Sequence, residues 1–164
     1  MIEIAVEDDA KAISSLIQST ARQQLRQEFS DDGWELFIKL LNEKTQKALI
    51  NNKKYRYWIA VAESSDKRTI KGLLVIKGGN HLFHFFVQPE YQGMGVGSKL
   101  WSNFLQDIQQ NLKKKSLFSN PPDKITVNSS DFGLPFYQHL GFEMVSGRQT
   151  KNGICYTPLI YNLL

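Results

Sequence analysis

Three glycines on alternate positions form the most distinctive group of residues in this sequence. The stretch Gln92-Gly93-Met94-Gly95-Val96-Gly97-Ser98 comes shortly after a proline and directly before a helical pattern. At the start of a helix the backbone N–H groups lack partners and the helix dipole is positive, so an anion is attracted there. Because glycine has no Cβ, an anion can approach these N–H groups closely. The stretch therefore predicts a phosphate site, with glycines that only relieve crowding in a tight loop as the alternative.

Two common phosphate motifs do not fit these letters. A P-loop requires Gly-Lys-Ser/Thr, but the order here is Gly97-Ser98-Lys99. A dinucleotide-binding fingerprint requires a third glycine where Ser98 stands, and the strands before it are expected to form a meander rather than a parallel unit.

The periodicity of apolar residues predicts the elements that position this loop. Strands are expected at residues 2–6, Tyr55–Glu63, Thr69–Lys77, His81–Gln88 and Lys124–Val127, and in a final pair joined at Asn152-Gly153. A polar turn, Ser64–Arg68, joins the second and third of these. Helices are expected around residues 13–21, from a capping box at Asp32 and Glu35 to about Asn51, around residues 100–112, and at Leu134–Leu140.

The order of these elements predicts a mixed α/β fold in which a central, mostly antiparallel sheet is flanked by helices. Three consecutive strands with short connections form an antiparallel meander, and the strand, helix and strand that follow form a βαβ crossover. With 164 residues, 41% of them hydrophobic, the chain is long enough for one domain with a sizeable core and too short for two. We expect a single domain over residues 1–164.

Two segments resemble the GNAT (Gcn5-related) N-acetyltransferase family. Residues 92–97 resemble its Gln/Arg-x-x-Gly-x-Gly/Ala signature, and "FYQHLGF" at residues 136–142 resembles its Phe-Tyr, two variable residues, Leu-Gly-Phe element. The match extends from about His81 to Phe142. The resemblance implies a GNAT-type fold and an enzyme that transfers acetyl from acetyl-CoA to a primary amine, with no metal and no covalent intermediate.

The resemblance also implies which residues bind acetyl-CoA. Its pyrophosphate would lie on the loop formed by Gln92, Gly93, Met94, Gly95, Val96, Gly97 and Ser98. Its pantetheine arm would pair as an added strand with Phe85, Phe86 and Val87, where the last meander strand splays from the crossover strand near a bulge. The position of the family's cofactor-contacting asparagine holds Ser130, and Asn128 lies two residues earlier, so either side chain is a candidate contact.

Tyr137 matches the family's usual proton donor. A phenol with a pKa near ~10 keeps its proton at neutral pH, and a thiolate whose conjugate acid has a pKa near ~8.5 accepts that proton. Many members carry a basic carboxylate on the last meander strand, but this strand has His81 and His84 instead. We select His84 as the candidate general base. A backbone N–H near Val87 would polarise the thioester carbonyl.

Four acidic residues lie between the two early helices, where this family often admits the acceptor: Glu28, Asp31, Asp32 and Glu35. They would attract a cationic amine, although helix capping explains Asp32 and Glu35 equally well.

Charge and cysteine content limit the remaining functional classes. The net charge of +4 favours an anionic partner. The run Lys113–Lys115 is interpreted as a solvated helix end, and no aromatic-basic pattern accompanies it, so we expect no nucleic-acid partner. Cys155 is the single cysteine, expected as a small apolar strand residue that cannot form an internal disulfide.

No apolar run approaches the roughly 20 residues of a membrane span, and the N-terminus lacks the pattern of a secretory signal. We therefore expect a cytoplasmic protein, monomer or homodimer, without a membrane partner. A non-catalytic (acetyl-)CoA-binding module is the alternative function, because it would keep the glycine loop without a productive acceptor site.

Overall fold

The computed structural model describes residues 1–62, 68–114 and 122–163 of the chain, without the side chains of residues 111–114. The predicted turn at Ser64–Arg68 lies outside these residues except for Arg68. The side chains of the Lys113–Lys115 run lie outside them as well, although α4 extends to Lys114.

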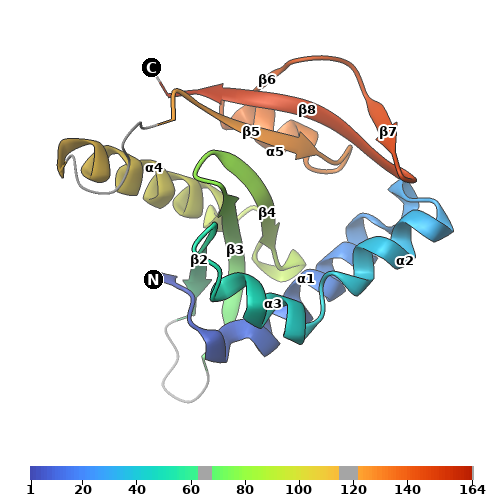
Figure 1. Cartoon of the computed structure of the whole chain (residues 1–164), viewed down its shortest axis with the longest axis horizontal. Helices are drawn as coiled ribbons and strands as arrows, with labels where there is room; N and C mark the ends of the chain where they lie inside the picture. Colours follow the sequence, from blue (N-terminus) through green and yellow to red (C-terminus); the bar gives the residue numbers. More distant parts are fainter. Residues whose placement is uncertain (63–67, 115–121, 164) are drawn as a thin grey trace.

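The chain groups helices α1 to α3 before the strands β2 to β4, and α4 and α5 lie between the later strands (Figure 1). The N-terminal half contains β1 (Ile2–Ile4), α1 (Ala10–Gln24), α2 (Asp31–Lys39), α3 (Glu43–Ile50), β2 (Tyr55–Val61), β3 (Ile70–Lys77) and β4 (His81–Val87). The C-terminal half contains α4 (Val96–Lys114), β5 (Lys124–Ser129), α5 (Leu134–His139), β6 (Glu143–Met144), β7 (Gln149–Lys151) and β8 (Ile154–Asn162). Within the described ranges no helix combines the length and the apolar content that a membrane span requires.

The strands form one mixed sheet in the order β1-β2-β3-β4-β5-β8-β6, and β7 pairs with β8. The pair β4–β5 is parallel, and the other pairs are antiparallel. This confirms the predicted meander over β2, β3 and β4 and the predicted crossover through α4. The fold class is therefore the mixed α/β class predicted from the sequence.

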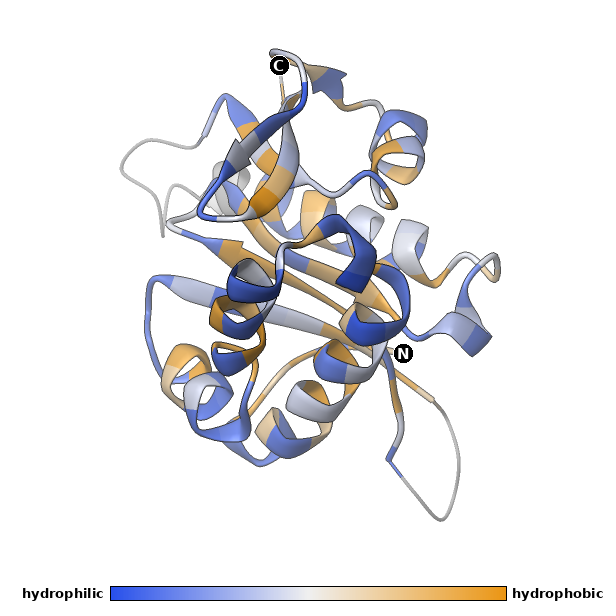
Figure 2. Cartoon of the chain, turned by 90° about the vertical axis from the view of Figure 1, so that its right-hand side faces the viewer, coloured by the Kyte–Doolittle hydropathy of each residue, from blue (hydrophilic) through white to orange (hydrophobic). Residues whose placement is uncertain are grey.

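Helices cover both faces of the meander, each over its own apolar cluster. Leu74 belongs to the cluster under α4 with Leu100, whereas the neighbouring Leu73 belongs to the cluster under α1 with Ile17. Successive residues of a strand point to opposite faces, so a nearly continuous apolar strand supplies both clusters. Figure 2 shows hydrophobic residues on the strands and on the sheet-facing sides of the helices.

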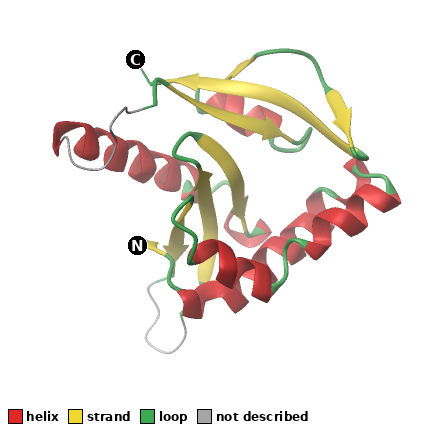
Figure 3. Cartoon of the chain, viewed as in Figure 1, coloured by secondary structure: helices red, strands yellow, loops and turns green. Residues whose placement is uncertain are grey.

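The predicted helix from Asp32 to about Asn51 is wrong, because two helices, α2 and α3, occupy this segment (Figure 3). The two helices are separate because Asn42 caps the start of α3. The side-chain oxygen of Asn42 accepts the N–H of Thr45 at 2.9 Å and starts α3 as a new helix.

The predicted capping box at the start of α2 is also wrong. Ser30 caps α2 instead, since its hydroxyl oxygen accepts the N–H of Gly33 at 3.1 Å. Asp32 and Glu35 are exposed residues within the helix.

A bulge in β4 separates this strand from β5. Ile76 pairs with Leu82 and Val75 pairs with His84, so Phe83 is an extra residue in β4. The parallel pairing with β5 covers only the first two residues of β4. After the bulge the two strands diverge, as the resemblance implies, and one edge of β4 is left without a strand partner in the described chain.

Candidate active site

The glycine loop, residues 92–98, leads from the end of β4 into α4. Gly93 and Gly95 have φ angles of 73° and 77°, which favour glycine, and a Cβ at either position would have no atom within 4 Å. The Gln92 side chain ties the loop to β4, because its Nε2 donates to the carbonyl of Val87 at 2.9 Å. In the described structure no backbone N–H from Gly93 to Ser98 has a hydrogen-bond acceptor. These donors lie at the positive end of a 19-residue helix, an arrangement suited to an anionic group.

Gly97 has a different role from the other two glycines. A Cβ at Gly97 would lie 2.7 Å from Cζ of Phe136, so only glycine lets the first turn of α4 approach this ring. Phe136 also packs edge-on against Phe85, with ring centroids 5.2 Å apart. Gly97 therefore joins the two sequence motifs physically, which the sequence pattern alone did not reveal.

Beyond the bulge, β4 presents backbone groups to the slot between β4 and β5. Gln88 donates its N–H to the carbonyl of Lys71 at 2.8 Å. Because residues of an antiparallel ladder alternate, the backbone groups of Phe86 then also face β3. Phe85 and Val87 direct their backbone groups into the slot. Of the three strand residues predicted to pair with a pantetheine arm, Phe85 offers both backbone groups to the slot, and Val87 offers its N–H, because the Val87 carbonyl accepts from Gln92.

The loop and the slot open into one cavity of about 820 Å³. The cavity extends from the glycine loop along β4 to residues of α2 and of the β7–β8 hairpin. Every residue predicted to bind acetyl-CoA or to act catalytically lines it, except Met94. The side chain of Met94 is 67% exposed, which leaves its backbone N–H as its contribution to the loop.

Tyr137 lies in the wall of this cavity and is only 7% exposed. Its ring packs near those of Phe85 and Phe142, at centroid distances of 6.2 and 5.3 Å. Its hydroxyl has no hydrogen-bond partner in the described chain. Burial raises the pKa of Tyr137, which therefore keeps its proton at neutral pH.

His84 lines the cavity from the opposite face of the sheet and is 8% exposed. The rings of Phe83 and Phe86 lie 4.3 and 5.7 Å from its ring. Burial lowers the pKa of His84 to about 4, against the opposing effect of a hydrogen bond to the Phe83 backbone. The imidazole is thus neutral at pH 7 and a weak base. His81 does not line the cavity, and its Nδ1 lies 2.8 Å from the Thr126 hydroxyl.

The two candidates for a side-chain contact to the cofactor differ in their availability. The hydroxyl oxygen of Ser130 accepts the N–H of Gly133 at 2.9 Å and so supports the turn before α5. The side chain of Asn128 is exposed and has no partner in the part of the chain that the structure describes. Asn128 therefore has the freer donor and acceptor groups.

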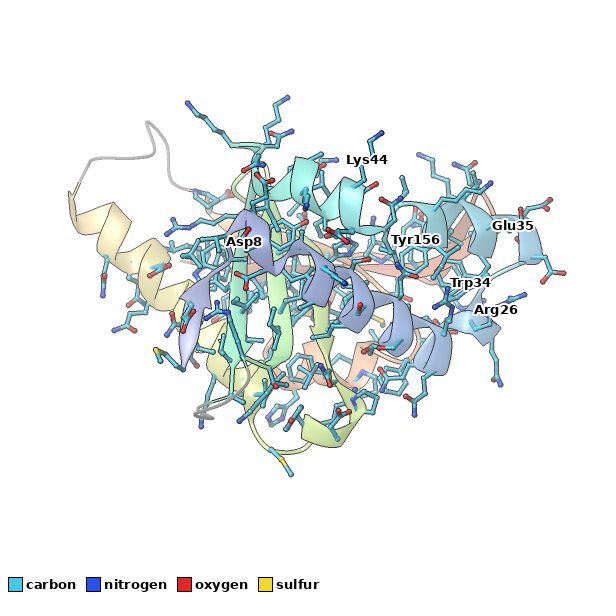
Figure 4. All side chains as sticks on the ribbon, turned by 90° about the horizontal axis from the view of Figure 1, so that it is seen from below. Asp8, Arg26, Trp34, Glu35, Lys44 and Tyr156 are labelled. Atoms are coloured by element: carbon cyan, nitrogen blue, oxygen red, sulfur yellow. The ribbon has the colours of Figure 1, made fainter. Side chains whose placement is uncertain are left out.

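The structure does not bring the four acidic residues of the early helices to the cavity. None of Glu28, Asp31, Asp32 and Glu35 lines it. The Glu28 carboxylate accepts the backbone N–H groups of residues 131 and 132, and Asp31 forms an ion pair with Arg26. Figure 4 shows Glu35 projecting outward from α2.

Sequence reasoning missed the part of the cavity that lies beyond β4, which we call the aromatic end. Its rings come from segments far apart in the chain: Phe29, Phe37, Phe83, Phe86, Phe132 and Tyr156. Phe37 fitted a helical apolar stripe, so its pattern indicated only core packing. Phe132 stands in a polar segment and is 52% exposed, and an isolated aromatic residue there was the one available signal.

The family model described as "Acetyltransferase (GNAT) domain" matches residues 25–163. The chain belongs to this family. Members of the GNAT family are acetyl-CoA-dependent N-acetyltransferases, and the predicted recognition and enzyme class are therefore confirmed. No protein with curated functional information matches the sequence significantly.

Solved GNAT structures share the fold over nearly the whole chain. A GCN5-related N-acetyltransferase from Rhodopseudomonas palustris has a TM-score of 0.73 and 18% identity, covering 99% of this chain and 94% of that one. The PaiA N-acetyltransferase from Thermoplasma acidophilum, solved in complex with coenzyme A, has a TM-score of 0.71 and 18% identity, covering 99% of both chains. The ribosomal-protein-S18-alanine N-acetyltransferase from Escherichia coli has a TM-score of 0.61 and 16% identity, covering 99% and 93%.

Proposed function

We propose that this GNAT protein transfers the acetyl group of acetyl-CoA directly to a primary amine, with Tyr137 as the general acid. One observation carries the proposal. A single cavity is lined by the glycine loop with its free amides, by β4 beyond its pairing with β5, and by Tyr137.

The residues present fit acetyl-CoA. The N–H groups of Gly93–Ser98 lack acceptors and would hold the pyrophosphate, while the backbone groups of Phe85 would pair with a pantetheine amide. The free side chain of Asn128 would add a polar contact at the other side of the slot. The complex of the Thermoplasma PaiA enzyme with coenzyme A supports this assignment.

Acetyl-CoA, when bound, supplies a thioester that an amine nitrogen can attack, with coenzyme A as the leaving thiol. The reaction is neutral in protons, because the nitrogen loses one proton and the sulfur gains one. Tyr137 lines the cavity and keeps its proton at neutral pH, which supports a role in protonating the sulfur. Apolar surroundings raise the pKa of a thiol as they raise that of a phenol. The two pKa values therefore stay close enough for the proton to pass from the phenol to the thiolate.

The attacking nitrogen must also lose a proton, and a base has to accept it. His84 lines the cavity and is our candidate base, but its lowered pKa of about 4 limits it to a brief relay of the proton. An amine that enters the cavity already neutral needs only such a relay. The N–H of Val87 faces the slot and would polarise the acetyl carbonyl.

Location and assembly are part of the same proposal. Cys155 lies half-buried in β8 and is free, which supports a cytoplasmic protein without disulfides. We propose one domain over residues 1–164, acting as a monomer or homodimer without a metal and without a nucleic-acid or membrane partner.

Thermal unfolding with and without acetyl-CoA tests the cofactor assignment. Saturation at 100 times the dissociation constant should add about 2.7 kcal/mol of stability. No shift in melting temperature at millimolar acetyl-CoA would refute it.

Coenzyme A release with an amine panel then separates the enzyme from a non-catalytic CoA-binding module, which would bind acetyl-CoA without turning over any amine. Tyr137→Phe should leave acetyl-CoA affinity and stability unchanged and lower the single-turnover rate about 10²- to 10⁴-fold. An unchanged single-turnover rate would remove Tyr137 from the reaction.

A further inference from the structure

The aromatic end of the cavity is the part that acetyl-CoA, as placed above, does not use. Its rings surround an apolar space, with Phe29 and Phe37 stacked at a centroid distance of 4.8 Å. They come from α2 and the segment before it, from β4, from the loop before α5 and from β8. Apolar and aromatic walls with few polar groups are typical of sites that bind the body of a small organic molecule.

The described lining of the cavity carries positive charge but no negative charge. Among the described residues that line it there is no Asp or Glu, and Lys151 is the only lysine or arginine. The nearby carboxylates already have partners: Glu28 accepts two backbone N–H groups, Asp31 pairs with Arg26, and Asp131 pairs with Arg148. A second positive charge on the acceptor would thus lose its water without gaining a carboxylate, which is unfavourable.

Backbone contacts between residues 29–33 and residues 153–154, which we call the clasp, close one side of the aromatic end. Phe29 forms an isolated antiparallel bridge with Ile154, and the N–H of Ser30 donates to the carbonyl of Gly153 at 3.1 Å. A Cβ at Gly33 would lie 2.5 Å from that same carbonyl oxygen, so the two backbones are in direct contact. Figure 1 shows the tip of the β7–β8 hairpin against α2. This side therefore offers no open groove for an extended peptide.

We propose that the acceptor is a small monoamine with an apolar body and no second positive charge. This inference rests on the proposed function and adds the acceptor class to it. The rings of the aromatic end would bind the apolar body, and the same surroundings favour the neutral, attacking form of the single amine. Polyamines, aminoglycosides and lysine-rich peptides are excluded by charge, and peptides also by the clasp.

The test measures the acetylation of three acceptors, two primary alkylamines and one peptide, by the purified protein at saturating acetyl-CoA. We expect kcat/KM for 2-phenylethylamine to exceed that for 1,4-diaminobutane, and that for a lysine-containing peptide, at least tenfold. Equal or faster acetylation of the diamine or the peptide would overturn the inference and leave the proposed transfer intact.

Calorimetry of 2-phenylethylamine binding to the protein loaded with coenzyme A separates the two proposals. Binding without acetylation would refute the proposed transfer and support the acceptor class. Neither binding nor acetylation would refute the acceptor class.

A charge reversal tests the electrostatic part of the argument. Lys151→Glu should raise kcat/KM for 1,4-diaminobutane about twofold to fivefold relative to 2-phenylethylamine, the range for an exposed ion pair. Lys44→Glu is the matched control, because Lys44 projects from α3 into solvent and does not line the cavity (Figure 4). An unchanged ratio in Lys151→Glu, or an equal change in Lys44→Glu, would contradict the role of charge at this site.

Discussion

Gly95→Ala separates the binding role of the glycine loop from its role in folding. Gly95 has a φ of 77°, and an alanine in the left-handed region costs about 1–2 kcal/mol. For a chain of this size, that corresponds to a fall in melting temperature of roughly 2–8 °C. The added Cβ meets no protein atom within 4 Å, so it projects into the space above the free N–H groups.

In that space the methyl group would displace an anion from one N–H donor. A hydrogen bond to a charged group contributes about 1.5–3 kcal/mol, so acetyl-CoA affinity should fall roughly tenfold to a hundredfold. Isothermal titration of acetyl-CoA measures this loss, and thermal denaturation of the same sample measures the strain.

Gly78→Ala is the matched control. Gly78 has a φ of 62°, a Cβ there would also meet nothing within 4 Å, and the residue lies in the β3–β4 turn outside the cavity. It should lose the same stability and keep full acetyl-CoA affinity. If both variants kept full affinity, the loop would not bind the pyrophosphate, and if both lost it equally, the loss would come from general destabilisation.

Three further predictions concern stability. Thr20→Val should stabilise the protein by about 1 kcal/mol in urea unfolding, because the buried Thr20 hydroxyl has no partner in the described chain, whereas Thr20→Ser should not. Gly97→Ala should destabilise by about 1–3 kcal/mol through its contact with Phe136, and adding Phe136→Leu should restore part of that loss. His84 binds protons more weakly in the folded state, so stability should fall as the pH drops from about 6.5 to about 4, by up to about 3 kcal/mol. His84→Gln should remove this part of the slope while the similar, smaller effect of His81 remains; an unchanged slope would contradict the burial argument.

Local patterns predicted the order of the central strands and the crossover helix, but not the division of the second predicted helix into α2 and α3. The β-branched and aromatic residues of β2, β3 and β4 indicate strands, and the short connections favour a meander because nearby antiparallel strands need only turns. The turn Asn152-Gly153 was predicted correctly, since both residues have a positive φ, which few other residue pairs adopt. Capping was less predictable, because Ser30 and Asn42 compete with neighbouring Asp and Glu residues for the same role.

The sequence by itself determined the family, the glycine loop and the position of Tyr137, because each depends on residues close together in the chain. Only the tertiary structure decided that Gly97 serves packing against Phe136, that His84 is buried with a lowered pKa, and that Glu28 is occupied by backbone groups of residues 131 and 132. The aromatic end of the cavity likewise depends on contacts between residues more than 100 positions apart, such as the bridge from Phe29 to Ile154. Burial and pairing arise when distant segments meet, and no local pattern encodes which segments will do so.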